Sequence, residues 1–208
     1  MVAGLGKDWA LKTISLRPWP AASSIQSVVT AVLALAETHD LHPDQVDRIE
    51  VGLSKTVYDM HGALPWDNKF RAQLSTPYVT GVALHDRRCW FEQFLPERLQ
   101  DPALGAFIRD HIQVVADGSV EDTGAVVTVH TSDSRTLEDR RAYPRGDAAD
   151  PLSRAEIFAK LRDAADGVLK LDAAGQTIDM LVDLANLSEM GELCSVLSRV
   201  VPAAARGS

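Results

Sequence analysis

The sequence SSIQSVVTAVLALAETHDL, residues 23–41, and the sequence VDRIEVGLS, residues 46–54, decide the fold class. In the first stretch, apolar residues recur at the spacing of one helical face, and Ser23 or Ser24 can cap its amino end. In the second stretch, apolar and polar residues alternate, which is typical of a strand with one buried face. A helix followed by such a strand indicates an α+β domain.

The next ninety residues continue this mixture of helices and strands. After residue 54, the turn residues at 61–68 predict a loop. A helix is expected from Thr76, its N-cap, with Pro77 in the first helical position. Short helices are expected at 90–99 and at 101–111, the second begun by Asp101. The expected strands are residues 112–117, 124–133 and 135–144, the last two joined as a hairpin around 132–134.

Beyond residue 150 the sequence becomes helical. Ser153 and Glu156 form a capping box for a helix at 154–169, and two more helices are expected at 174–187 and 189–201. The predicted division is therefore an α+β domain at 14–150 and a helical segment at 151–203. That segment is rich in apolar residues that little else in the chain can cover, which predicts an interface.

Composition excludes several function classes. A formal net charge of −8 argues against a nucleic-acid partner, because phosphate binding needs a basic face. Basic pairs such as Arg140-Arg141 are typical of a solvated surface. No run approaches the roughly 18 apolar residues of a membrane span, and no signal-peptide pattern opens the chain. We expect a cytoplasmic protein with two reduced thiols, Cys89 and Cys194. The histidines show no metal-binding spacing, so no metal site is expected.

Three short stretches carry candidate chemistry. In LRPWP, residues 16–20, Arg17 can bind a carboxylate, or it can be a surface cation beside a core tryptophan. In QLSTPY, residues 73–78, Tyr78 lies near helix-terminal N–H groups that favour anions, or it is a buried tyrosine with a bonded hydroxyl. YPRGD, residues 143–147, is expected to be a turn whose Arg145 pairs locally or across a domain boundary. No convincing general base accompanies these residues.

These three stretches, in this order, resemble the C-terminal part of the MmgE/PrpD family. That family includes 2-methylcitrate dehydratase, cis-aconitate decarboxylase and iminodisuccinate epimerase. The likeness covers most of the chain. It runs through GLGKDWALKTISLRPWPAASSIQSVVTAVLAL at 4–35, RAQLSTPYVTGVALHDRRCWFEQFLPERLQDPALGAF at 71–107 and YPRGDAADPLSRAEIFAKLRDAA at 143–165.

The resemblance implies an architecture and a kind of reaction. Residues 14–150 would be the family's lid domain, with a mixed or antiparallel sheet, and the tail helices would pack into a large helical domain. We expect a separate chain to supply the other half of that helical domain, although an isolated fragment is the other explanation. The family acts on small polycarboxylates without metal or organic cofactor. It removes a proton next to a carboxylate, then loses water or carbon dioxide or returns the proton to the other face.

The resemblance also assigns the site residues. Arg17 stands at the lysine of the family's K-x-Y-P motif and Tyr78 matches its L-P-Y tyrosine, so both are expected to be catalytic. Arg17, Ser24 and Gln26 are expected to bind substrate. Gln26 stands at the family's histidine, and Ala21 or Ala22 at its cysteine. An arginine binds a carboxylate or stabilises an enolate but does not easily cycle a proton, and a glutamine is neither acid nor base.

Three functional hypotheses follow. The first is the lid subunit of a two-chain lyase or isomerase that acts on a carboxylate-bearing small molecule. The second is a non-catalytic binding or assembly module, because Arg17 and Gln26 replace the family's reactive residues. The third is a self-sufficient enzyme formed by homodimerisation of the exposed faces.

Overall fold

The computed structural model describes residues 6–7 and 9–201 and has an α+β fold, as the sequence predicts. The chain divides between Pro151 and Leu152 into two compact units. We call the first the body and the second the tail unit, and describe each by itself. The predicted division placed this boundary one residue earlier, between 150 and 151.

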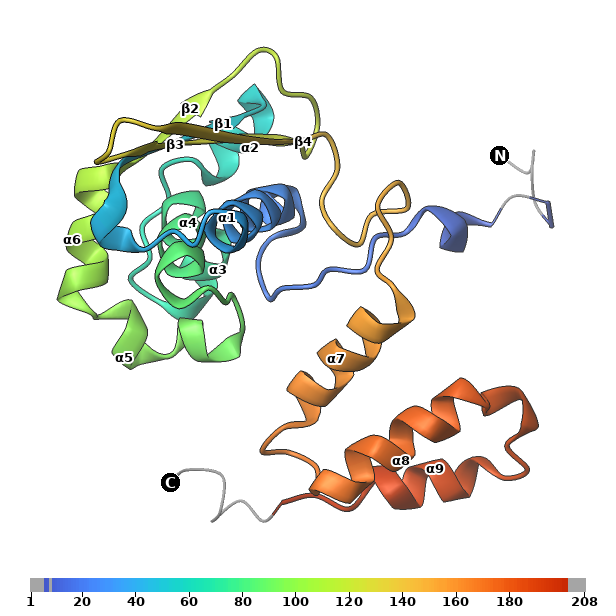
Figure 1. Ribbon diagram of the computed structural model, residues 1–208. Coiled ribbons are helices and arrows are strands. Elements are labelled where there is room, and N and C mark those ends of the chain that lie inside the picture. Colours follow the sequence, from blue (N-terminus) through green and yellow to red (C-terminus); the bar gives the residue numbers. More distant parts are fainter. Residues whose placement is uncertain (1–5, 8, 202–208) are drawn as a thin grey trace. The chain divides into compact units, whose positions relative to one another are not determined.

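The body is built on a four-stranded mixed sheet with strand order β2-β1-β3-β4 (Figure 1). Its strands are β1 (Val46–Leu53), β2 (Ile112–Ala116), β3 (Ala125–Thr131) and β4 (Thr136–Arg141). Strand β1 pairs in parallel with β2 and antiparallel with β3, so Ile49 lies opposite both Ile112 and Val129. Strands β3 and β4 form the predicted hairpin.

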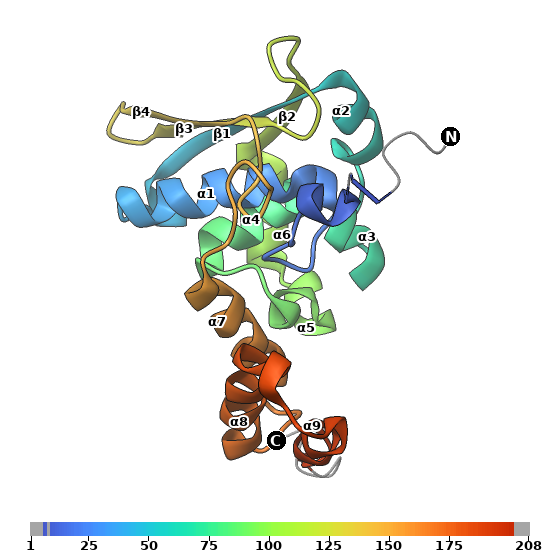
Figure 2. The ribbon, with the colours of Figure 1, turned by 90° about the vertical axis from the view of Figure 1, so that its right-hand side faces the viewer.

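Three helices cover one face of this sheet (Figures 1 and 2). They are α1 (Gln26–Thr38), α4 (Thr76–Asp86) and α6 (Pro102–His111). Helix α1 packs on β3 and β4, and the apolar side chains of β1 belong to the same core, where Ile25, Ile49 and Leu53 are fully buried. The opposite sheet face carries polar side chains such as Glu50 and Thr128, as is usual when only one face of a sheet is packed.

The shorter elements lie around this core. They are the helices α2 (Lys55–His61), α3 (Lys69–Leu74) and α5 (Pro96–Leu99), and the 3₁₀ turns Ala10–Thr13, Ser23–Ile25, Pro43–Gln45 and Phe91–Phe94. Helices α2 and α3 correct the predicted loop after residue 54. Each has two turns or fewer and buries few side chains, so neither leaves a helical pattern in the sequence.

Two predicted helix starts are also corrected. No serine side chain caps α1, because residues 23–25 form a 3₁₀ turn and Ile25 takes the N-cap position. The N-cap of α4 is Ser75 rather than Thr76, and its hydroxyl accepts a hydrogen bond from the backbone N–H of Tyr78. The expected cap of α6 is confirmed, since the Asp101 carboxylate accepts from two N–H groups of the first turn at 2.8 and 3.2 Å.

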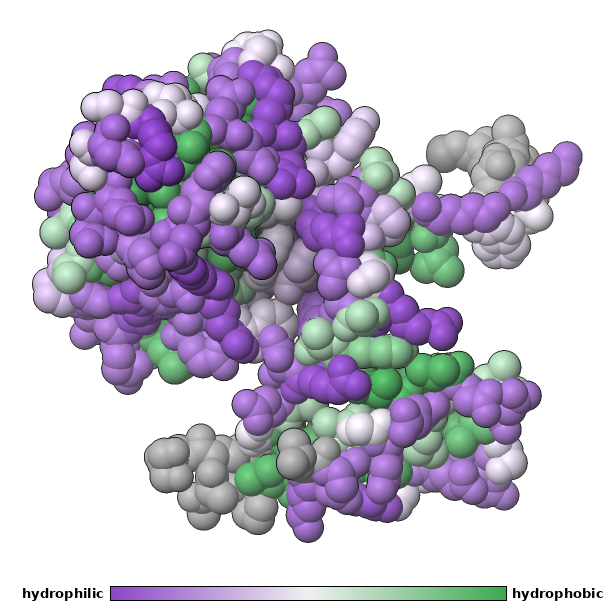
Figure 3. Space-filling view, in the orientation of Figure 1, coloured by the Kyte–Doolittle hydropathy of each residue, from purple (hydrophilic) through white to green (hydrophobic). Residues whose placement is uncertain are grey.

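The tail unit contains α7 (Arg154–Ala165), α8 (Leu171–Val182) and α9 (Met190–Leu197), with a 3₁₀ turn at Leu184–Asn186. The capping box of Ser153 and Glu156 is confirmed. Helices α8 and α9 pack together through Ile178, Leu193 and Val196. Hydrophobic surface, green in Figure 3, remains on this unit. Its exposed hydrophobic residues are Ile157, Val168, Leu181, Val182, Leu184, Met190, Leu197 and Val200.

Across residues 6–7 and 9–201, every helix is too short or too polar to pass through a bilayer.

Candidate functional site

Two of the stretches that the sequence singles out lie side by side in the body. The backbone N–H of Leu16 donates to the carbonyl oxygen of Gly146 at 2.8 Å. Ser15, the residue before Leu16, and Asp147, the residue after Gly146, make a second contact, in which the Ser15 hydroxyl donates to the Asp147 carboxylate at 2.7 Å. The segments SLRPWP and YPRGD, which are more than a hundred residues apart in sequence, therefore form one edge of the body, which we call the Arg17 edge.

The close contact between these two segments depends on a glycine. Gly146 has φ +93°, a left-handed conformation that residues with a side chain rarely adopt. A Cβ atom added at this position would lie 1.9 Å from the carbonyl oxygen of Leu16. No side chain fits in that space, so a residue without one lets the two segments meet.

Gln26 joins the same edge to helix α1. Its side chain is 1% exposed, and its Nε2 atom donates to the carbonyl oxygens of Ala21 and Trp19 at 2.9 and 3.1 Å. Its Oε1 atom accepts the backbone N–H of Trp19 at 3.4 Å. The amide therefore holds the turn Trp19–Ala21 against the first residue of α1, a structural role that the sequence did not predict.

A cavity of about 90 Å³ opens at this edge, and we call it the Arg17 cavity. Its lining residues are Ser15, Leu16, Arg17, Ser23, Gln26, Thr123, Pro144, Arg145 and Asp147. The structure thus brings together Arg17 and Gln26, two of the predicted site residues, and adds Arg145. Ser24, predicted to bind substrate, does not line this cavity, although its neighbour Ser23 does.

The charges of the Arg17 cavity suit an anion. Arg145 forms the local ion pair that the sequence allowed, with Asp150. The pKa of Asp147 is held below its usual value, first by the backbone N–H of Ala149 and then by the Ser15 hydroxyl. Asp147 is therefore ionised at neutral pH and is already a hydrogen-bond acceptor, which makes it a poor general base. The guanidinium groups of Arg17 and Arg145 also line this cavity, and a guanidinium group can bind a carboxylate.

Tyr78 lies in the core of the body. Its side chain is 0% exposed, its hydroxyl donates to the carbonyl oxygen of Gln93 at 2.5 Å, and its ring packs against Trp66 and Phe94. Burial raises the pKa of this phenol well above its usual value. Of the two alternatives that the sequence offered for Tyr78, the structure shows the buried tyrosine with a hydrogen-bonded hydroxyl. Tyr78 does not line the Arg17 cavity. A catalytic role for Tyr78 stays a prediction that this geometry does not support.

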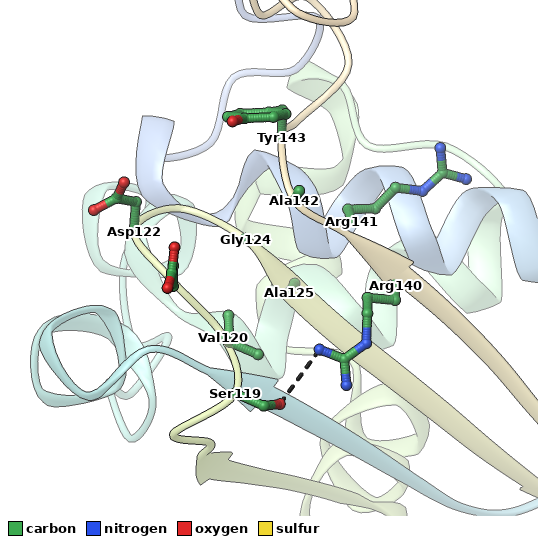
Figure 4. A pocket seen from close by; sticks show the side chains of 10 residues that line it. Ser119, Val120, Asp122, Gly124, Ala125, Arg140, Arg141, Ala142 and Tyr143 are labelled. Carbon is green, nitrogen blue, oxygen red and sulfur yellow. Dashed lines mark hydrogen bonds between the residues drawn. The ribbon is translucent and has the colours of Figure 1, made fainter.

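Sequence reasoning missed a second cavity, of about 240 Å³, between the β2–β3 connection and the end of β4 (Figure 4). We call it the β3–β4 cavity. It is lined by Ser119, Val120, Glu121, Asp122, Gly124, Ala125, Arg140, Arg141, Ala142 and Tyr143. The pair Arg140-Arg141 was expected to be a solvated surface. Arg140 is exposed as expected, faces this cavity and donates to the Ser119 hydroxyl at 3.3 Å, whereas Arg141 is half-buried and pairs with Asp139. The one sequence signal for this cavity is the acidic loop sequence VED at 120–122 together with the basic pair Arg140-Arg141.

The sequence that forms these elements matches the model of a known domain family. Residues 19–185 match the family model described as "MmgE/PrpD C-terminal domain". The chain belongs to the MmgE/PrpD family. The matched region includes Gln26, Tyr78 and the YPRGD turn, while Arg17 lies two residues before it. No curated protein matches the chain.

The MmgE/PrpD resemblance implies chemistry without a metal. Among the residues that the structure describes, no three or more His, Cys, Asp or Glu side chains converge as metal ligands would. The absence of a cofactor and of a metal stays an expectation from the family.

Proposed function

We propose that this chain is the C-terminal lid portion of an MmgE/PrpD-type lyase or isomerase that acts on a carboxylate-bearing small molecule. The helical half of the enzyme would come from a separate chain. The observation that carries the proposal is the meeting of two family segments around the Arg17 cavity, with the guanidinium groups of Arg17 and Arg145 in its lining.

Arg17 and Arg145 would supply binding and electrostatic stabilisation. A guanidinium group stays charged at any working pH and offers paired donors to a carboxylate. The same donors stabilise the negative charge that develops when a proton leaves the carbon beside that carboxylate. Among the residues that the structure describes, the titratable groups in the lining are these two arginines and the ionised Asp147. Proton transfer would therefore fall to residues of the helical half.

The surface of the tail unit supports a protein partner. Exposed Leu181, Leu184 and Met190 lie on and between the two packed helices. An open hollow of about 560 Å³ lies between the end of α7 and the start of α8 and is lined partly by small residues such as Ala165 and Gly175. Such a surface fits the apolar side chains of another helix. The sequence 171–197 carries five acidic residues and no lysine or arginine, so the partner face would carry basic residues at its rim.

The proposal is tested by purifying the full chain alone and together with an all-helical protein encoded next to it. We expect a stable heteromer by light scattering after size exclusion. Leu181→Asp and Met190→Asp should each abolish it, while Ser188→Asp, at an exposed polar position of the same hairpin, should leave it intact. A stable, monomeric chain that binds no such partner would rule the proposal out.

Activity of the assembled complex is tested with small di- and tricarboxylates. Arg17→Ala should lower kcat/KM by about tenfold or more, as expected when a charged hydrogen bond to a substrate is lost. Arg17→Lys should retain more of that activity, because the lysine keeps the charge and restores the family's residue type. Arg109→Ala, an exposed arginine of α6 outside both cavities, is the matched control.

A second candidate function is a non-catalytic binding or assembly module. It is favoured by Gln26, whose amide hydrogens are taken up by backbone carbonyl groups, and by the buried hydroxyl of Tyr78. This candidate predicts a heteromer without turnover and with unchanged ligand affinity in the Arg17→Ala variant. Loss of turnover in that variant would count against it.

A further inference from the structure

The β3–β4 cavity holds charges of opposite sign that do not pair with each other. Within the described residues, Glu121 and Asp122 form no ion pair, and the one hydrogen bond of the Arg140 side chain goes to Ser119. Figure 4 shows Asp122 and Arg140 on opposite sides of the cavity, with the ring of Tyr143 beside it. Of the two arginines in the lining, Arg141 is paired with Asp139, whereas Arg140 lies across the cavity from Glu121 and Asp122 and also interacts electrostatically with Asp117.

The backbone holds these groups in place. The Ser54 hydroxyl donates to the carbonyl oxygen of Asp122 at 2.7 Å, and Asp122 itself has φ +44°. The turn closes through the Gly124 N–H, which donates to the carbonyl oxygen of Glu121 at 2.9 Å. A Cβ atom on Gly124 would lie 2.8 Å from the carbonyl oxygen of Arg141, so the loop packs closely on the end of β4. The two sides of the cavity are thus fixed relative to each other.

We propose that the β3–β4 cavity binds a small zwitterion with an ammonium group at one end and a carboxylate at the other. The carboxylate would accept hydrogen bonds from Arg140. The ammonium group would lie between Glu121 and Asp122, with the exposed ring of Tyr143 as a further cation-binding surface. A simple anion is disfavoured by the two carboxylates and a simple cation by the arginine, so the site selects for a ligand with both charges.

The size of the cavity agrees with such a ligand. A volume of about 240 Å³ holds several water molecules or one small amino acid. The cavity shares no lining residue with the Arg17 cavity, although Thr123 and Pro144 of the latter are each adjacent in sequence to its residues. The inference stands on the charges of this cavity alone and does not depend on the proposed function.

The test is isothermal titration calorimetry of the full chain with glycine, β-alanine, γ-aminobutyrate and 5-aminopentanoate. We expect at least one of these probes to bind with a Kd on the order of 1 mM, as is reasonable for a ligand of a few atoms. Butyrate and butylamine, which each lack one charge, should bind at least about tenfold more weakly. Equal binding of either control, or no saturable binding of any amino acid, would overturn the proposal.

Variants locate the bound probe. Arg140→Gln and the double variant Glu121→Gln/Asp122→Asn should each weaken binding by about tenfold or more. All three side chains are exposed, so the fold should persist, which an unchanged melting temperature would verify. Arg109→Gln, on α6, is the matched control and should bind normally. Binding that survives both the Arg140 and the double variant would refute the site.

A second measurement separates this site from the Arg17 cavity. In amide NMR spectra, the best probe should shift signals of residues 119–124 and 140–143 and leave those of 15–17 in place. Arg17→Ala should leave the affinity of the probe unchanged. Loss of zwitterion binding in Arg17→Ala would contradict the proposal, whatever the fate of the proposed lyase or isomerase function.

Discussion

The side-chain amide nitrogen of Gln26 donates hydrogen bonds to the carbonyl oxygens of Trp19 and Ala21, and so ties the Arg17 edge to helix α1. The family resemblance places a histidine at this position. A glutamine is neither an acid nor a base, and here its amide has a clear structural role.

Replacing Gln26 should therefore destabilise the body. Gln26→Ala leaves buried carbonyl oxygens without a donor, and the expected cost is about 1–3 kcal/mol in the free energy of unfolding. Urea denaturation measures this difference. Gln100→Ala, at an exposed position, should change stability by less than about 0.5 kcal/mol. An equal effect of the two substitutions would show that the amide does not hold the turn.

Gly146→Ala should separate the two segments of the Arg17 edge. The added methyl group would overlap the carbonyl oxygen of Leu16, and φ +93° is strained for alanine. We expect a loss of more than about 2 kcal/mol and faster hydrogen exchange of the Leu16 amide. Gly118→Ala is the matched control, because nothing lies within 4 Å of its Cβ position. Normal protection of Leu16 in Gly146→Ala would contradict the observed contact.

Tyr78→Phe distinguishes a structural from a catalytic tyrosine. Loss of the hydrogen bond to Gln93 should cost about 1–2 kcal/mol of stability, with little change in kcat of an assembled complex. Because burial raises the pKa of Tyr78, the folded state keeps its proton while the unfolded chain loses it above about pH 10. Stability from this residue thus falls as pH rises beyond that point, and Tyr78→Phe should remove this part of the pH dependence. Abolished turnover with unchanged stability would restore the catalytic assignment.

Asp101 should contribute to stability only above acidic pH. Its pKa is lowered mainly by the backbone N–H of Leu104, with further help from the N–H of Ala103 and the charge of Arg98. A lowered folded-state pKa means that the contribution is present above about pH 4 and is lost as pH falls through that range. Asp101→Ala should cost about 1 kcal/mol at pH 7 and much less at pH 3. Asp110→Ala, on the exposed side of α6, should have no such pH dependence.

The two cysteines should differ in reactivity. Cys89 is fully buried, and burial, with a smaller effect of Asp86, raises its pKa to about 12. Cys194 is exposed. A thiol reagent at pH 8 should therefore modify one group quickly in the native chain and both groups only after unfolding. Cys194→Ser should eliminate the fast phase, and a fast phase that persists in that variant would contradict the buried position of Cys89.

The sequence predicted the elements that have a strong periodic pattern. Helix α1, the hairpin of β3 and β4, and the caps at Asp101 and Ser153 all carry local signals, and the structure confirms them. Helices α2 and α3 were missed because each is too short to show a periodic pattern. The α4 cap was displaced by one residue because Ser75 and Thr76 are adjacent and both suit the position.

The candidate site was only partly predictable for a different reason. Arg17 stood out locally and Gln26 only through the family resemblance, but their proximity to Arg145 depends on a contact between distant segments that Gly146 permits. Likewise, Arg140 and Asp122 face one cavity because β3 and β4 pair in a particular register, and no local pattern encodes that pairing.

The hydrogen bond between Leu16 and Gly146 also places a segment near the start of the α+β body beside a segment near its end. A domain whose two ends lie close together can be inserted into another domain through two short connecting segments, without disturbing its own core. The same geometry makes circular permutation feasible: new termini could open at the 132–134 hairpin while a short linker joins the old ones. The body is thus a topologically self-contained module, whichever polypeptide carries it.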